Sequence, residues 1–255
     1  MLAVKGSFRE IFLLYLIAMA LSLLLAYPPP PEVPPEGKDP ATAGVFFGYL
    51  LLATAVFILL IKFFPWLFRH VLFALELFFL FLTTAVISTS LGLPGTLPFL
   101  AVIVRVIWRR SVLVQNASTV TIISVATAVV GSSLAPTVAV ILLAVLSLYD
   151  CVSVFVTKHM VVLARALGAG EEKNGKGRNV HLLGGGDIAI PGILAVSLLR
   201  VSPAAAAAAA LGACIGLVLT ARLVERWKRV LPALPTIALA ELLMTAAALT
   251  LSLSP

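Results

Sequence analysis

The sequence predicts an all-α, polytopic membrane protein with nine transmembrane helices, the N-terminus cytoplasmic and the C-terminus outside. Of the 255 residues, 61% are hydrophobic and 11% are charged, whereas roughly 25% of the residues in a soluble domain are charged. Long charge-free runs occupy most of the chain and leave no room for a soluble domain. We therefore treat 1–255 as a single membrane domain, with an N-terminal bundle of five spans at 1–133 and a C-terminal part with spans six to nine at 135–255.

Each span is an apolar run long enough to form a membrane helix. The predicted spans are 11–27, 42–64, 66–89, 91–108, 117–133, 135–157, 186–200, 203–221 and 231–253. The seventh is short and begins at a glycine-rich stretch, so a count of eight is the alternative. The first could also be a secretory signal peptide, but no small-x-small cleavage site precedes the prolines that follow it.

The distribution of basic residues supports nine spans and sets their orientation. With a cytoplasmic N-terminus, only Lys38 and Arg200 fall in outside segments. All the other basic residues fall on the cytoplasmic side: Lys5, Arg9, Lys62, Arg69, Arg105, Arg109, Arg110, Lys158, Arg165, Lys173, Lys176, Arg178, Arg222, Arg226, Lys228 and Arg229. This is a strong positive-inside bias, and removing one span would scramble the alternation after it. We expect a multi-pass protein of the cell membrane.

Three segments between or within the spans have distinctive compositions. The proline-rich outside loop at 28–40 predicts an extended spacer without regular structure. The glycine-rich, charged inside loop at 168–179 predicts a mobile connection. The alanine run at 204–210 predicts close helix packing, because small residues let helix backbones approach in lipid.

Composition also argues against several kinds of partner and cofactor. The formal charge of +7 does not indicate a nucleic-acid partner, because the basic residues lie at cytoplasmic span ends. Cys151 and Cys214 both lie within spans, so neither a disulfide framework nor a zinc site is expected. We predict no metal and no cofactor, and the sequence does not indicate an oligomeric state.

Four acidic residues lie inside apolar sequence, where ionisable side chains are rare and face a bundle interior or a water-filled cavity. They are Glu76, Asp150, Asp187 and Glu241. For Glu76 and Glu241 we favour a protonated or hydrogen-bonded glutamate between helices over a role in gating.

Asp150 and Asp187 are predicted to lie at a similar depth. Asp150 precedes Lys158 by eight residues, which is about 12 Å of helix at 1.5 Å per residue. Asp187 opens the next span, which runs in the opposite direction, so both carboxyl groups belong to the cytoplasmic half of the membrane. Two close carboxyl groups do not both ionise easily in a low-dielectric site, and such a pair shares a proton in aspartic proteases. The alternative is two unrelated residues, one lining a pore and one capping a helix.

Two other irregular stretches converge at this depth. Gly184, Gly185 and Gly186 remove side chains next to Asp187, so a substrate backbone could approach closely. A glycine-rich turn before a helix N-terminus is also common without such a role. The stretch LPALP at 231–235 opens the ninth span, and irregular backbone at membrane depth is tolerated only in a protein interior or along a cavity.

These residues resemble the three signatures of the presenilin and signal peptide peptidase family of intramembrane aspartyl proteases. The signatures are YD at Tyr149 and Asp150, GGGD at 184–187, and PAL at 232–234. Their order and spans also match, over the chain from about 135 to the end. The stretch IAIPG after Asp187 resembles the signal peptide peptidase branch and the orientation resembles presenilin, which together imply a prokaryotic, archaeal homologue.

The resemblance implies an aspartic endopeptidase that acts within the membrane on the transmembrane helix of a substrate protein in the lipid bilayer. Asp150 and Asp187 are the implied catalytic pair, and Tyr149 and Gly186 the residues that shape the site. The glycines of GGGD, with Pro232, Ala233 and Leu234, are the implied substrate-binding residues. The alternative function is a proton-coupled transporter or channel that uses the same carboxylates. Inverted repeats would favour it, and the two halves of the sequence show none.

Overall fold

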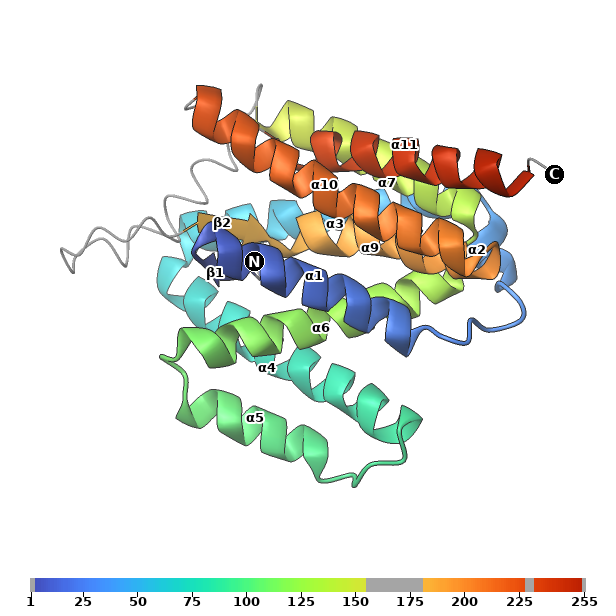
Figure 1. Cartoon of the computed structure of the whole chain (residues 1–255). Coiled ribbons are helices and arrows are strands. Elements are labelled where there is room, and N and C mark those ends of the chain that lie inside the picture. The colour runs from blue at the N-terminus through green and yellow to red at the C-terminus, as the bar shows by residue number, and fades with distance from the viewer. Residues whose placement is uncertain (1–2, 155–180, 228–231, 254–255) are drawn as a thin grey trace.

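The computed structural model describes residues 3–154, 181–227 and 232–253, which form a bundle of helices with one small sheet (Figure 1). The helices are α1 (Phe8–Leu25), α2 (Pro35–Lys38), α3 (Ala41–Phe63), α4 (Pro65–Ser90), α5 (Leu97–Ile107), α6 (Val112–Ser133), α7 (Pro136–Val152), α9 (Gly185–Ser197), the 3-10 turn η3 (Leu198–Arg200), α10 (Pro203–Trp227) and α11 (Leu234–Leu253). The predicted all-α class is confirmed, and each predicted span overlaps one of the longer helices.

Length and composition qualify five of the described helices to cross a membrane, namely α1, α4, α6, α10 and α11. Three more, α3, α5 and α7, contain shorter apolar stretches. The number of crossings and the orientation of the termini stay predictions. The end of the sixth predicted span at 155–157 and the charged loop at 168–179 lie outside the described residues.

Several helices begin where the local chemistry satisfies their first backbone groups. Ser7 caps α1 in a capping box, in which its hydroxyl accepts from the Glu10 backbone N–H while the Glu10 carboxylate accepts from the Ser7 N–H at 2.8 Å. Ser111 caps α6 through the N–H of Val114. Helices α4 and α7 start with proline, which has no N–H to leave unpaired.

Two expectations about the connections were wrong. The fourth span was expected from residue 91, but α5 starts only at Leu97, because Gly92 adopts a left-handed conformation with φ of 61° and starts a turn. The loop at 28–40 was expected to lack regular structure, yet it contains α2. Gly37 of this short helix is buried, and its carbonyl accepts from the Ala135 N–H at 2.9 Å, which docks the loop at the junction of α6 and α7.

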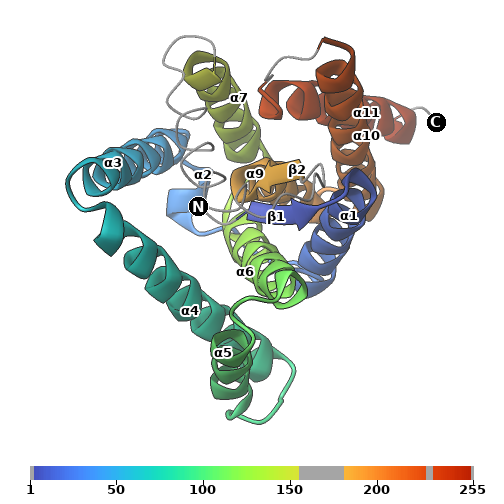
Figure 2. The same ribbon diagram turned by 90° about the vertical axis from the view of Figure 1, so that its left-hand side faces the viewer.

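Helix α9 lies at the centre of the bundle when the helices are viewed end-on (Figure 2), and it packs against α1, α6, α7, α10 and α11. Its residues Leu194 and Ala195 are fully buried. Close contact with α6 depends on two glycines, since a Cβ on Gly131 would lie 2.7 Å from Val196 and one on Gly192 would lie 2.6 Å from Thr127. These glycines bring the two backbones together as small residues do in membrane interfaces.

Helices α10 and α11 form the most extensive helix pair of the bundle. A Cβ on Gly212 would lie 2.7 Å from the Glu241 Cα, and one on Gly216 would lie 2.5 Å from the Ile237 Cα. On the same helix, Ala206 and Ala209 are fully buried in the largest core cluster. The close packing predicted for the alanine run is therefore confirmed.

Two short strands that the sequence analysis did not predict form an antiparallel sheet. Strand β1 (Ala3–Gly6) pairs with β2 (His181–Gly184), with Ala3 opposite Gly184. Since β1 leads into α1 and β2 leads directly into α9, the sheet joins the N-termini of these two helices (Figure 2).

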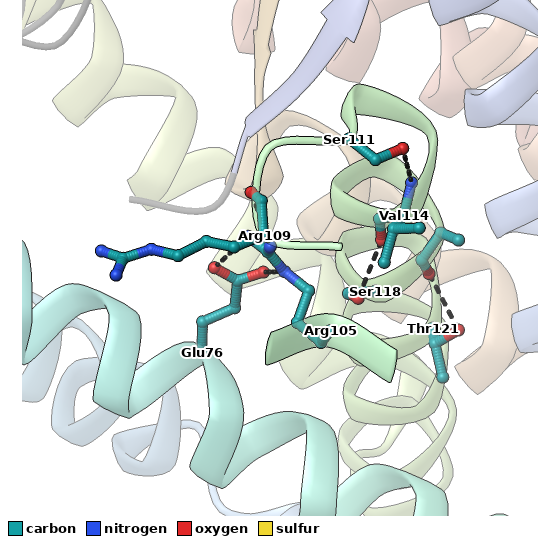
Figure 3. Close-up of polar contacts among 8 residues, drawn as sticks. Glu76, Arg105, Arg109, Ser111, Val114, Ser118 and Thr121 are labelled. Atoms are coloured by element: carbon teal, nitrogen blue, oxygen red, sulfur yellow. Dashed lines mark hydrogen bonds and ion pairs between the residues drawn. The ribbon is translucent and has the colours of Figure 1, made fainter. Parts of the chain in front are cut away.

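A buried ion pair joins α4 to α5 (Figure 3). These two helices lie at the edge of the bundle (Figure 2). The Arg105 guanidinium donates to both carboxylate oxygens of Glu76, at 2.6 and 3.1 Å, and a third bond reaches the Arg109 carbonyl at 3.1 Å. The Arg109 guanidinium lies 4.3 Å from the centre of the Phe73 ring. Glu76 is thus hydrogen-bonded between helices, as expected, and its partner is a cation that the sequence analysis had counted only as a cytoplasmic charge.

Candidate active site

Asp150 lies near the C-terminal end of α7 on the face that this helix turns to the core. Leu143 and Leu146 are buried, and Asp150 follows them by seven and four residues, which places all three side chains on one helical face. The Oδ2 atom of Asp150 accepts a hydrogen bond of 3.2 Å from the Leu234 backbone N–H, and the Ala233 amide also interacts with this carboxyl group. The first turn of α11 therefore holds Asp150.

Asp187 lies in the first turn of α9, directly after strand β2. Gly184 is the residue before the helix, and its backbone amide interacts with the Asp187 carboxyl group. A carboxylate is favoured at this position, because the first backbone N–H groups of a helix point toward it. The next residue, Ile188, is buried in the core, which anchors the turn that carries Asp187.

The two carboxyl groups come from helices that pack against each other. Helix α7 contacts α9, which brings Asp150 and Asp187 within electrostatic range of each other. Both side chains are only partly buried, unlike the core residues around them. This arrangement suits a pair of carboxyl groups that shares one proton and is open to a reactant.

The PAL stretch contacts Asp150 through its backbone. Pro232 and Leu234 are buried and Ala233 is partly buried, and the Leu234 side chain is 3% exposed within the main core cluster. In this structure the Leu234 side chain packs in the core and its backbone N–H holds Asp150. Substrate binding by Pro232, Ala233 and Leu234 stays a prediction.

The remaining predicted site residues are placed around the two aspartates. The Tyr149 ring packs edge-on against Phe47 of α3, with ring centres 5.7 Å apart and an interplanar angle of 77°. Gly184 and Gly185 are partly exposed and Gly186 is exposed. A Cβ on Gly186 would contact only the Ile190 Cδ1 at 3.8 Å, which is ordinary contact, so packing does not require a glycine there.

Strand β2, which leads directly into the turn that carries Asp187, was missed in the sequence analysis. Strand β1 pairs with one of its edges. Each strand has four residues, which is too short for an alternating pattern to be recognised. In the part of the chain that the structure describes, no three His, Cys, Asp or Glu side chains converge as a metal site would require.

A family model described as "Signal-peptide peptidase, presenilin aspartyl protease" matches residues 12–170, which is more than half of the chain. The chain belongs to this family. The family match includes Asp150 and the first five spans, where the sequence resemblance had been one of number only. It ends before Asp187 and the PAL stretch.

Two solved structures of a "presenilin family intramembrane aspartate protease" have the same fold. One, in a P2 space group, has 23% identity and a TM-score of 0.72 over 96% of this chain and 98% of that chain. The other, in a C222 space group, has 25% identity and a TM-score of 0.71 over 95% of this chain and 98% of that chain. Curated protein sequences gave no significant match. The chain is an intramembrane aspartic protease, which favours the predicted endopeptidase over the transporter.

Proposed function

We propose that Asp150 and Asp187 are the catalytic pair, and that this presenilin-family protease hydrolyses peptide bonds within single-span membrane proteins. The observation that carries the proposal is the placement of these two partly buried carboxyl groups on packed helices, within electrostatic range of each other. One carboxylate takes a proton from water, and the protonated partner polarises the scissile carbonyl. The pair returns to its shared-proton state when the products leave.

The Leu234 N–H has a positioning role in this reaction. Its bond to Oδ2 of Asp150 fixes which edge of the carboxyl group faces Asp187. Gly184 acts in the same way on Asp187 from the other side of the pair. Catalysis depends on such preorganisation, because reacting groups must be held close to their productive geometry.

A substrate helix must also open, since its carbonyls are hidden in its own backbone hydrogen bonds. Strand β2 leads directly into the turn that carries Asp187, and β1 pairs with one of its edges. We propose that an unwound substrate segment pairs with the other edge, which would replace the bonds lost on unwinding. The scissile bond then lies beside the two aspartates.

The substrate class follows from the predicted orientation. With the N-terminus inside, the aspartates lie in the cytoplasmic half of the membrane. The family resemblance then favours single-span substrates whose N-terminus is outside, such as the membrane remnants that another protease leaves.

Cleavage of a single-span reporter by the purified protein in detergent tests this function. Asp150→Asn and Asp187→Asn should each lower the rate by roughly 10²-fold or more, because each removes one member of the acid–base pair. Asp39→Asn is the matched control, since Asp39 is the only other aspartate of the chain and lies exposed before α3. Mass spectrometry should place the cut within the span for the parent. Cleavage by both variants at the parent rate would refute the proposal.

A further inference from the structure

A second group of polar side chains is buried beside the catalytic pair. Tyr15 on α1 and Glu241 on α11 are both 0% exposed. Neither the Tyr15 hydroxyl nor either carboxylate oxygen of Glu241 has a hydrogen-bond partner among the described residues. Buried polar atoms without partners are costly, and native proteins rarely keep them without a reason.

These two residues lie close to each other and to Asp187. Tyr15 lies within electrostatic range of Glu241, Cys214 and Asp187. Tyr15 also belongs to the core cluster that contains Ile188, the neighbour of Asp187, and Ile237, one helical turn before Glu241. Four helices, α1, α9, α10 and α11, thus bring their polar side chains to one place.

The packing of α10 prevents Glu241 from reaching lipid or water. A Cβ on Gly212 would lie 2.7 Å from the Glu241 Cα, so the backbones of α10 and α11 are in direct contact at this point. Glu241 therefore stays in the interior. A buried carboxylate without a cation is far more costly than a neutral acid, so a protonated Glu241 suits the site.

We infer that Glu241 and Tyr15 are positioning residues that hold Asp187 through a chain of hydrogen bonds closed by buried water. The inference rests on the proposed catalytic role of Asp187. In this hydrogen-bond chain the Glu241 acid donates through water to the Tyr15 oxygen, and the Tyr15 hydroxyl donates through water to the Asp187 carboxyl group. The chain satisfies the unpartnered hydroxyl, and a water in it would satisfy the remaining carboxyl oxygen.

The consequence for the reaction is a fixed carboxyl group. The Gly184 amide interacts with Asp187 at the N-terminus of α9, and the Tyr15 hydroxyl would hold Asp187 from α1. The two contacts together would set the oxygen that faces Asp150. The variant Tyr15→Phe removes one oxygen atom from this arrangement and leaves the shape of the core unchanged.

Kinetics and infrared spectroscopy of purified protein test the inference. Tyr15→Phe should lower kcat by about 3- to 10-fold, the effect of one lost hydrogen bond, and leave KM unchanged. Tyr49→Phe, at a tyrosine of α3 that is 68% exposed, is the matched control and should change neither. One carbonyl band of a neutral carboxylic acid, other than that of the Asp150 and Asp187 pair, should disappear in Glu241→Gln and move to higher frequency in Tyr15→Phe, because the hydrogen-bond chain from the acid is broken.

Failure of this inference is distinguishable from failure of the proposed function. An infrared band that stays unmoved in Tyr15→Phe, or a kcat equal to the parent's, overturns the proposed hydrogen-bond chain. Asp187→Asn in the same assay tests the function on which the chain rests. If Asp187→Asn is inactive while Tyr15→Phe matches the parent, only the proposed hydrogen-bond chain is wrong. If Asp187→Asn cleaves at the parent rate, the catalytic role of Asp187 and the hydrogen-bond chain are both wrong.

Discussion

The backbone N–H of Leu234 donates a hydrogen bond of 3.2 Å to Oδ2 of Asp150, across 84 residues of sequence. It joins the first turn of α11 to the last turns of α7. Because the donor is a backbone group at the start of a helix, its direction is fixed by the fold. This contact therefore couples the packing of α11 to the orientation of one carboxyl group of the proposed catalytic pair.

Removal of this N–H should impair catalysis without preventing folding. Leu234→Pro deletes the donor at a position where proline is tolerated, the first residue of a helix. We expect cleavage to fall by roughly 10-fold or more, since a bond to a charged group is lost. Leu234→Ala is the control, because it keeps the N–H and loses only core packing, at a cost of about 2–4 kcal/mol in stability. Equal cleavage rates per folded molecule for the two variants would show that the N–H is unimportant.

The contact between α10 and α11 should be sensitive to one methyl group. In Gly216→Ala the new Cβ would lie 2.5 Å from the Ile237 Cα, so the helices must separate. We expect a loss of about 1–3 kcal/mol in stability and slower cleavage, because α11 carries Leu234. Thermal unfolding in detergent and reporter cleavage measure the two effects. Gly44→Ala on α3 is the control, since its Cβ would meet no atom within 4 Å, and an equal loss there would contradict the explanation.

The ion pair of Glu76 and Arg105 should contribute to stability and not to chemistry. Both side chains are largely buried, at 11% and 4% exposure, so Glu76→Gln leaves a buried cation without its charge partner. We expect a loss of roughly 3–5 kcal/mol in unfolding free energy, with the cleavage rate per folded molecule unchanged.

A double variant completes the test of this ion pair. Glu76→Leu with Arg105→Met removes both charges and should recover most of the stability, because apolar residues replace buried ion pairs well. If the double variant is as unstable as Glu76→Gln, or if Glu76→Gln slows cleavage in fully folded protein, the structural role is wrong.

Strand β1 should support the active site by holding β2. Deletion of residues 3–6 removes the strand that pairs with His181–Gly184, and we expect slower cleavage because β2 leads into the turn that carries Asp187. Replacement of the same four residues by valine and threonine, which favour strands, is the control and should keep activity. Faster cleavage after the deletion would contradict this role and indicate that β1 competes with the substrate.

The helices and both aspartates were predictable because each has a local signal. Apolar runs and the alternation of basic residues located the spans, and α7 and α9 carry Asp150 and Asp187 where the motifs placed them. The boundary of α5 was missed although Gly92 and the proline that follows it were visible in the sequence, because hydropathy outweighed the turn residues in the prediction.

The missed contacts have no local signal. A backbone N–H looks the same in every residue, so the bond from Leu234 to Asp150 cannot be predicted from residue type. The pairing of β1 with β2 joins two four-residue segments at distant points in the chain. Glu76 and Arg105 lie 29 residues apart on different helices, and each looked like a separate charge until the packing of α4 against α5 was known.

The most direct test of the central claim is a structure of the protein with a peptide in which a hydroxyl-bearing isostere replaces the scissile bond, as a mimic of the tetrahedral transition state. The account predicts that the hydroxyl lies within hydrogen-bond distance of both the Asp150 and the Asp187 carboxyl groups, with the peptide backbone extended beside β2. A hydroxyl that contacts only one of them, or a peptide bound away from both, would contradict the catalytic pair.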